Sequence, residues 1–259
     1  MGKRVYQAGK KTAVILAALF LLSGCGSATE EMKTGRTEGI ALLESGDYEG
    51  AVSRFDEVIS QASRVTDFEL DVLKYRAEAE LKLEDYQAAA YTYGILSQVD
   101  EPKPEYEYLE ALCLARGGNP EGAKAALVEG KALDESLSGF GYEEAMMAIG
   151  EAYAASGDME AADRTYQELV SQGHANTGIY NRWALSAMEA GNYEEALSYI
   201  QTGLALSDDT ARKELRFNEA VCCEYLGQYE QALSLFQAYE AEFGSDEQTA
   251  HEIAFLVTR

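Results

Sequence analysis

Residues 184–200 read ALSAMEAGNYEEALSYI, and they contain the pattern that decides the fold. Gly191 follows a run of helix-favouring residues, and glycine readily takes the left-handed backbone conformation that ends a helix. Asn192 can accept the first free amide hydrogens of a second helix, and Glu194 in the first turn of that helix suits its dipole. The stretch therefore predicts two helices joined by a tight turn.

The same pattern occurs six times along the chain. Each turn has four residues, and an alanine lies three residues after the third of them, as Ala196 follows Tyr193. A large apolar residue comes four residues after that alanine, which places both on one helical face. A glycine or alanine lies twelve residues before each alanine, where two helices of a hairpin can approach closely. The turns begin at Gly46, Glu84, Gly118, Gly157, Gly191 and Gly227. The alanines are Ala51, Ala89, Ala123, Ala162, Ala196 and Ala232.

This arrangement resembles the tetratricopeptide repeat, a helix-turn-helix unit of about 34 residues. The resemblance implies an all-α superhelical solenoid of about six hairpins over residues 34–245, followed by a capping helix over residues 246–259. Glu84 replaces the turn glycine in the second repeat, so a left-handed residue is less expected there. Longer intervals after the first and third repeats place extra residues at 60–67 and 135–141.

The composition is that of an acidic globular protein. Hydrophobic residues make up 47% of the 259 residues, which is more than a disordered acidic chain carries. The formal net charge of −24 argues against a nucleic-acid partner, because phosphates would be repelled at every approach.

Residues 1–24 are predicted to be a bacterial lipoprotein signal peptide. Four basic residues precede an apolar run over residues 13–22, which is too short to span a membrane. The run ends in Leu22-Ser23-Gly24-Cys25, which resembles the site where the cysteine is lipidated and becomes the new N-terminus. The alternative is an ordinary secretory signal with a chance cysteine. Residues 25–33 are interpreted as the lipidated cysteine and a flexible tether.

A lipidated Cys25 implies attachment to the cell membrane, on its extracytoplasmic face, through a two-chain diacyl anchor. Removal of the signal peptide leaves 17 basic and 45 acidic side chains, so the mature protein is still more acidic. The Cys25-Gly26-Ser27 junction and the acidic body resemble lipoproteins of Gram-positive bacteria, which favours such a source.

The family resemblance also implies a binding groove. In this family the first helix of each pair lines a concave surface that holds a peptide or a helix of another protein. Basic residues in the first two repeats and apolar ones in the last repeats suggest a ligand with an acidic end and an apolar end. The alternative is that Tyr108, Met147 and Phe217 pack between repeats. The predicted groove residues are Arg36, Lys74, Tyr108, Leu112, Arg116, Met147, Asn181, Leu185, Phe217, Val221 and Tyr225.

Little in the sequence indicates catalysis. His174 and His251 have no spacing to other metal ligands, so neither a metal nor another cofactor is predicted. Cys113, Cys222 and Cys223 fall where small core residues are expected. An enzyme with an unrecognised site in the loops remains a third hypothesis.

The leading hypothesis is a membrane-tethered scaffold that binds a peptide or a segment of an unidentified envelope protein. The second hypothesis is an accessory lipoprotein of an envelope assembly or secretion complex, similar to the repeat-containing lipoprotein of the outer-membrane barrel assembly machinery.

Overall fold

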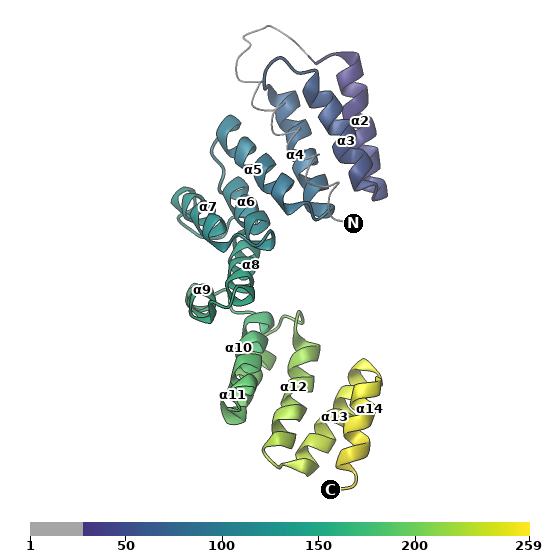
Figure 1. The fold of residues 1–259 in the computed structure, drawn as a ribbon, viewed down its shortest axis with the longest axis vertical. Helices are drawn as coiled ribbons and strands as arrows, with labels where there is room; N and C mark the ends of the chain where they lie inside the picture. The colour runs from purple at the N-terminus through teal and green to yellow at the C-terminus, as the bar shows by residue number, and fades with distance from the viewer. Residues whose placement is uncertain (1–27) are drawn as a thin grey trace. The chain divides into compact units, whose positions relative to one another are not determined.

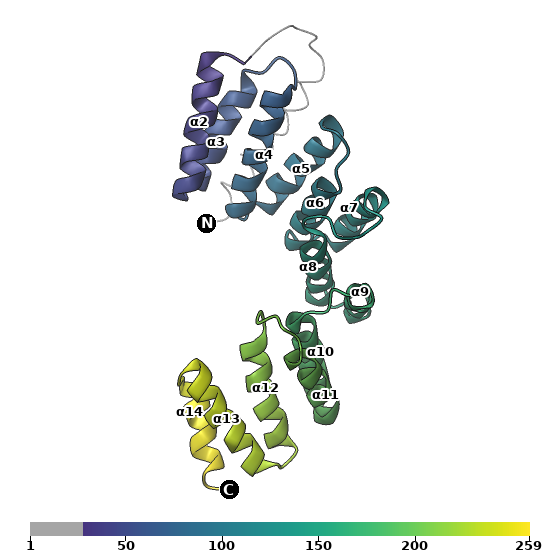
Figure 2. The same cartoon turned by 180° about the vertical axis from the view of Figure 1, so that it is seen from behind.

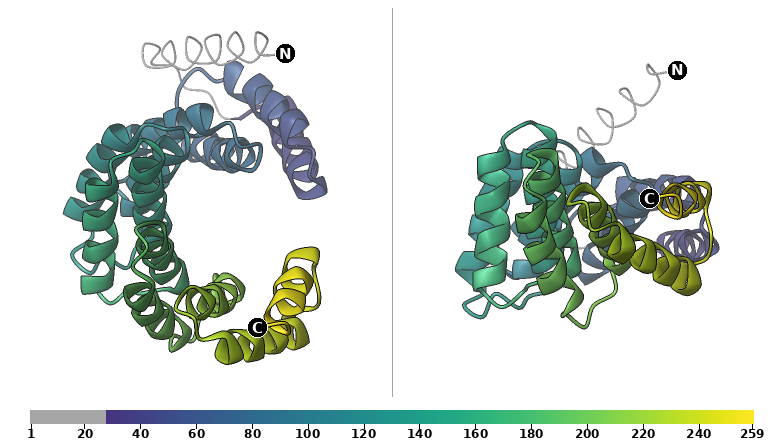
Figure 3. Two further views of the ribbon diagram at one scale, coloured as in Figure 1. Left: turned by 60° about the horizontal axis from the view of Figure 1, so that its bottom comes forward. Right: turned by 90° about the horizontal axis from the view of Figure 1, so that it is seen from below.

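The computed structural model describes residues 28–259, so the predictions for the signal peptide and Cys25 lie outside the described residues. Within this range the chain forms thirteen helices and no strand, which confirms the all-α prediction (Figure 1, Figure 3). The first six are α2 (Glu30–Ser45), α3 (Tyr48–Ser60), α4 (Asp67–Lys82), α5 (Tyr86–Val99), α6 (Pro104–Arg116) and α7 (Pro120–Leu133). The others are α8 (Tyr142–Ala155), α9 (Met159–Ser171), α10 (Thr177–Glu189), α11 (Tyr193–Leu204), α12 (Arg212–Tyr225), α13 (Tyr229–Phe243) and α14 (Glu247–Leu256).

The helices form two compact units, one ending at Tyr166 and the other spanning Gln167–Arg259. None of the helices in residues 28–259 is long and apolar enough to cross a bilayer.

Local capping explains where the helices begin and end. The hydroxyl of Thr29 accepts a hydrogen bond from the Met32 amide, so α2 begins at Glu30 and includes residues that the sequence placed in the tether. The Asp47 carboxylate accepts from the Gly50 amide at 3.0 Å and caps α3. Glu84 takes the left-handed conformation at φ 60°, contrary to expectation, because the turn geometry outweighs the preference for glycine there.

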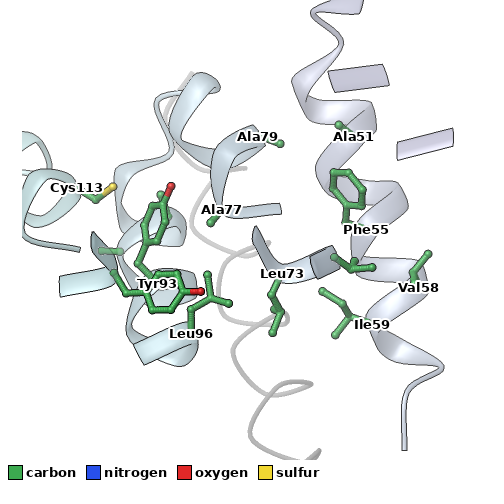
Figure 4. Packing of buried hydrophobic residues seen from close by; sticks show 14 of the residues in the cluster. Ala51, Phe55, Val58, Ile59, Leu73, Ala77, Ala79, Tyr93, Leu96 and Cys113 are labelled. Carbon is green, nitrogen blue, oxygen red and sulfur yellow. The ribbon is translucent and has the colours of Figure 1, made fainter. Parts of the chain in front are cut away.

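In the first unit each helix packs on the next one, from α2 to α8. Ala51 and Phe55 are fully buried, and Figure 4 shows them on the side of α3 that faces Leu73. Gly39 provides the close approach predicted from the spacing: a Cβ atom there would lie 2.5 Å from the Phe55 ring. The small residue and the aromatic residue of the repeat therefore meet directly, and the alanine lies in the same buried cluster as the aromatic residue.

A buried ion pair joins α4 to its neighbours in the same unit. The Arg76 guanidinium lies 2.6 Å from Asp56 of α3 and 2.9 Å from Glu80, and it also bonds the Thr92 hydroxyl of α5. Thr92 donates to the second Glu80 oxygen at 2.6 Å. Burial raises the pKa of Glu80 to about 7, although the Arg76 charge opposes this shift.

The second unit has the same construction. Helices α10 to α13 pack in sequence, and α14 packs on α13 (Figure 2). Leu256 of α14 is buried with Phe236 of α13 and Cys223 of α12, so the last helix covers apolar surface of the preceding hairpin.

Candidate functional site

A cleft of about 670 Å³ lies in the first unit, where α6 ends beside α8. We call it the alanine cleft. Small side chains dominate its lining, and the larger groups are one aromatic ring, one guanidinium and one carboxylate. It is lined by Tyr86, Ala115, Arg116, Gly118, Ala148, Glu151, Ala152, Ala155 and Ser156.

The cleft forms because small alanine side chains line one face of α8. Ala148, Ala152 and Ala155 recur at helical intervals, so they share one face of α8. Ala115 is buried near the C-terminus of α6, where Gly118 at φ 80° turns the chain away. Apart from Glu151, the α8 residues that line the cleft are alanines, and a segment of another chain can therefore approach the backbone closely.

Two opposite charges line the cleft. Arg116 is the last residue of α6, where the negative end of the helix dipole favours a cation, and its guanidinium lies 5.9 Å from the centre of the Tyr86 ring. Glu151 is exposed on α8. Neither side chain forms an ion pair with any residue in the described range 28–259. Both charges are therefore available to a ligand.

The lining supplies small apolar side chains and two opposite charges as contacts for binding. It contains no cysteine or histidine, and the Ser156 hydroxyl donates to the Tyr153 carbonyl at 2.8 Å. Among residues 28–259, no group of three His, Cys, Asp or Glu side chains could hold a metal ion. The arrangement can hold a segment that presents an anionic group to Arg116 and a cationic group to Glu151.

Sequence comparison agrees with the hairpin architecture. One tetratricopeptide repeat profile matches residues 36–98 and 181–247, and a second matches residues 144–176. The chain belongs to the tetratricopeptide repeat (TPR) family. No curated protein has a sequence similar enough to match it.

Solved structures show the same fold at low sequence identity. The apo form of the quorum sensor NprR from B. thuringiensis is 12% identical with a TM-score of 0.59, covering 97% of this chain and 75% of that one. PilW, a type IV pilus biogenesis factor, is 16% identical with a TM-score of 0.55, covering 89% and 100%. A TPR protein from Parabacteroides merdae is 15% identical with a TM-score of 0.53, covering 95% and 91%. These similarities show the fold alone.

The structure places two of the three basic residues predicted for the TPR groove, Arg36 and Lys74, in internal ion pairs. Arg36 pairs with Asp71 and lies 5.5 Å from the centre of the Tyr75 ring. Lys74 lies 3.2 Å from Asp100, whose carboxylate also accepts a hydrogen bond from Tyr106. These charges are already partnered within the fold, in contrast to Arg116.

Tyr108 and Leu112 are corrections to the predicted groove. Tyr108 is completely buried, and its hydroxyl donates to Asp134 at 3.2 Å. Leu112 is also buried. Tyr108 belongs to the core because the connection between α7 and α8 folds over the start of α6, as Gly139 beside the Tyr108 ring indicates. Met147 is half-buried on α8.

The predicted groove residues of the second unit lie on α10 and α12. Asn218 donates to the Asn181 amide oxygen at 2.9 Å, which links the two helices. Phe217 is half-buried, and its ring lies 5.4 Å from that of Phe236 on α13, the second helix of the same hairpin. Leu185 and Val221 are also half-buried.

Tyr225 is the exception in this unit, since it is 66% exposed and stacks on the Tyr193 ring with centroids 4.5 Å apart.

Sequence reasoning missed most of the alanine cleft. It selected Arg116, but the alanines of α8 gave no signal beyond their helical spacing, which is equally common in buried helix faces. Tyr86 had been assigned only to a turn. Its contribution depends on the position of Arg116 above its ring, which is a contact between two helices.

The three cysteines of the described range are free and fully buried, as expected for core residues. Burial raises the pKa of Cys113 and of Cys222 to about 12. These thiols stay protonated at neutral pH, so they are poor nucleophiles.

Proposed function

We propose that this TPR protein is a lipid-anchored scaffold on the extracytoplasmic face of a bacterial cell membrane, where the alanine cleft holds a segment of another envelope protein. The proposal assigns no chemistry to the scaffold. TPR proteins bind protein or peptide partners, and in the alanine cleft unpaired charges coincide with a recessed apolar floor.

The observation that carries the binding proposal is the unpaired Arg116 at the edge of an alanine floor. A volume of about 670 Å³ is within the usual range for ligand sites and accommodates a few side chains rather than a whole domain. A guanidinium that is not used by the fold can form a charge-assisted hydrogen bond with a carboxylate of the ligand. We therefore expect a peptide segment with an acidic residue near Arg116 and a basic one near Glu151.

Replacement of Arg116 by Glu is expected to weaken peptide binding at least tenfold, because an attractive charge becomes repulsive. The test selects peptides from a random twelve-residue display library on the full-length protein and measures their affinities by fluorescence anisotropy. Glu151→Lys is expected to shift the selected sequences toward acidic residues.

Lys124→Glu is the matched control, because Lys124 is an exposed basic residue of α7 that does not line the cleft. It makes the same change in net charge. Equal loss of affinity in both variants would show a general charge effect and would reject the cleft as the site.

The anchor rests on Cys25 and has its own test. Cells grown with an alkyne fatty acid are expected to label the wild-type protein and not Cys25→Ser. The other three cysteines are fully buried, so they offer little access for acylation of the folded protein. Ser27→Ala should remain labelled and in the membrane fraction. Labelling that persists in Cys25→Ser would contradict the proposed anchor.

A further inference from the structure

The connection between α7 and α8 is an ordered loop of residues 134–141 that departs from the repeat pattern. It contains extra residues compared with a regular repeat junction, and it lies outside the ranges that match TPR profiles. Asp134 organises the loop: its carboxylate accepts from the Ser136 amide at 3.1 Å, the Ser136 hydroxyl at 2.7 Å and the Gly139 amide at 2.8 Å. The Ser136 hydroxyl and the other donors hold the pKa of Asp134 below its usual range.

The loop is also fixed to the core of the first unit. The Tyr108 hydroxyl donates to the same Asp134 carboxylate, and the Tyr108 and Tyr142 rings lie 5.2 Å apart beneath the loop. A Cβ atom on Gly139 would lie 3.0 Å from the Tyr108 ring, so the backbone packs directly on that ring. Leu137 takes a left-handed conformation at φ 52°, which is unfavourable for a leucine and persists only where the surroundings enforce it.

This ordered loop presents an aromatic side chain to solvent. Phe140 is 70% exposed, the highest fraction among the large exposed hydrophobic residues of the described chain. Its exposure gives it little share in the core. Transfer of a phenylalanine side chain from water into an apolar pocket favours binding, and a binding residue held in one conformation loses less entropy on association. Phe140 therefore has two properties of a binding anchor: an exposed apolar side chain and a loop that holds it in a fixed conformation.

The charges around Phe140 indicate the kind of partner. Glu135 and Glu144 flank it in sequence, are exposed, and make no hydrogen bond or ion pair within the described structure. Glu143 is exposed beside them. The basic residue closest to Phe140 in the sequence is Lys131, whose ammonium lies 5.7 Å from the centre of the Tyr142 ring. The charged residues that flank Phe140 most closely in the sequence are thus acidic on both sides.

We propose that Phe140 is an anchor that inserts into an apolar pocket of a second protein, and that the pocket is rimmed by Lys or Arg side chains that face Glu135 and Glu144. This surface is separate from the alanine cleft, because no residue of the loop 134–141 lines the cleft and Phe140 precedes the N-terminus of α8, whereas Ala148 is the first α8 residue in the cleft lining. One scaffold can therefore hold two partners in its first unit.

A membrane surface is the competing occupant, because an exposed aromatic residue can also enter the lipid interface. The flanking carboxylates argue against it, since anionic headgroups would repel them. A basic protein surface gains from the same charges, which accelerate association and set its orientation.

The test places the photocrosslinking residue p-benzoylphenylalanine at position 140 of the full-length protein in the producing cells, and at position 128 as a control. Val128 is 55% exposed on α7, outside the loop. A protein crosslinked from position 140 and not from position 128 is identified, purified and titrated against wild type, Phe140→Ala and Val128→Ala. We expect Phe140→Ala to lower its affinity at least tenfold and Val128→Ala to change it less than twofold.

Charge reversal separates the two parts of the proposal. Glu135→Lys with Glu144→Lys is expected to lower the association rate severalfold at low salt, with the difference vanishing at high salt. The proposal is overturned if position 140 crosslinks only to lipid or to no protein, if Phe140→Ala binds the partner as wild type does, or if charge reversal strengthens binding. Circular dichroism of each variant should match wild type, because the changed side chains are exposed. None of these outcomes depends on Arg116, so failure here leaves the cleft proposal standing.

Discussion

Replacement of Arg76 by Met is expected to lower the free energy of unfolding by about 3–5 kcal/mol, the usual cost of removing one partner from a buried ion pair. The Arg76 and Glu80 side chains are 3% and 1% exposed, so water cannot replace the missing guanidinium. The readout is urea denaturation followed by circular dichroism. Fluorescence of Trp183, the one tryptophan, reports separately on α10 in the second unit.

The loss should depend on pH. Burial already raises the pKa of Glu80 to about 7, and removal of Arg76 raises it further. The folded variant then binds a proton that the unfolded chain releases near pH 4.5. Its stability therefore falls as pH rises toward the raised folded pKa, and the deficit relative to wild type should be larger at pH 8 than at pH 5.

The double variant Arg76→Met with Glu80→Met is the control, because replacement of both partners by apolar groups leaves no buried charge between them. Thr92 can still donate to the Ala88 carbonyl at 3.1 Å, and Asp56 is partly exposed to water. The double variant should be more stable than Arg76→Met alone. A loss below 1 kcal/mol in the single variant would contradict the assigned role of the ion pair.

Gly150→Ala is expected to cost about 2 kcal/mol, although alanine is the better helix former by about 1 kcal/mol. A Cβ atom at this position would lie 2.2 Å from the ring of Tyr166, which is buried and cannot swing into solvent. Ordinary contact between carbon atoms is about 3.5–4.0 Å, so α8 and α9 must separate or the ring must move. Thermal and urea denaturation measure the change.

Gly94→Ala is the matched control, since Gly94 is also a glycine within a helix. There the added methyl would meet the carboxylate end of Glu110 at 3.1 Å, a flexible group that can move aside. This variant should be neutral or more stable by up to about 1 kcal/mol. Substitution of Tyr166 by Leu should reduce the cost of Gly150→Ala, and equal costs in both backgrounds would show that the ring is not the cause.

The hairpin architecture could be predicted because the signals that specify it are local and repeated. Gly39 lies twelve residues before Ala51, and Phe55 lies four residues after it. Helical spacing puts Ala51 and Phe55 on one face of α3, and the short turn at Gly46 brings Gly39 of α2 against the Phe55 ring. The cap residue Asp47 likewise acts on an amide three residues away. At Glu84 the same turn formed without glycine, because the contacts of its hairpin outweighed one unfavourable backbone conformation.

The candidate site could be predicted only in part. Arg116 was identified from its position in the repeat, yet Tyr108, two turns earlier on α6, proved to be buried. In the TPR pattern, Tyr108 and Arg116 both occupy positions that face outward from the first helix of a repeat. The difference arises from the loop of residues 134–141, which covers Tyr108 and leaves the end of α6 open.

Repeat spacing and capping chemistry thus determined the helices, their pairing and the residues at the contact within each hairpin, because each depends on atoms a few turns apart in one chain segment. Which outward residues remain available to a ligand was decided by tertiary packing: Asp71 and Asp100 neutralise the basic residues Arg36 and Lys74, while Arg116 keeps an unpaired charge. The partners that bury or neutralise a side chain come from other helices and loops, so their positions follow from packing between helices rather than from sequence spacing.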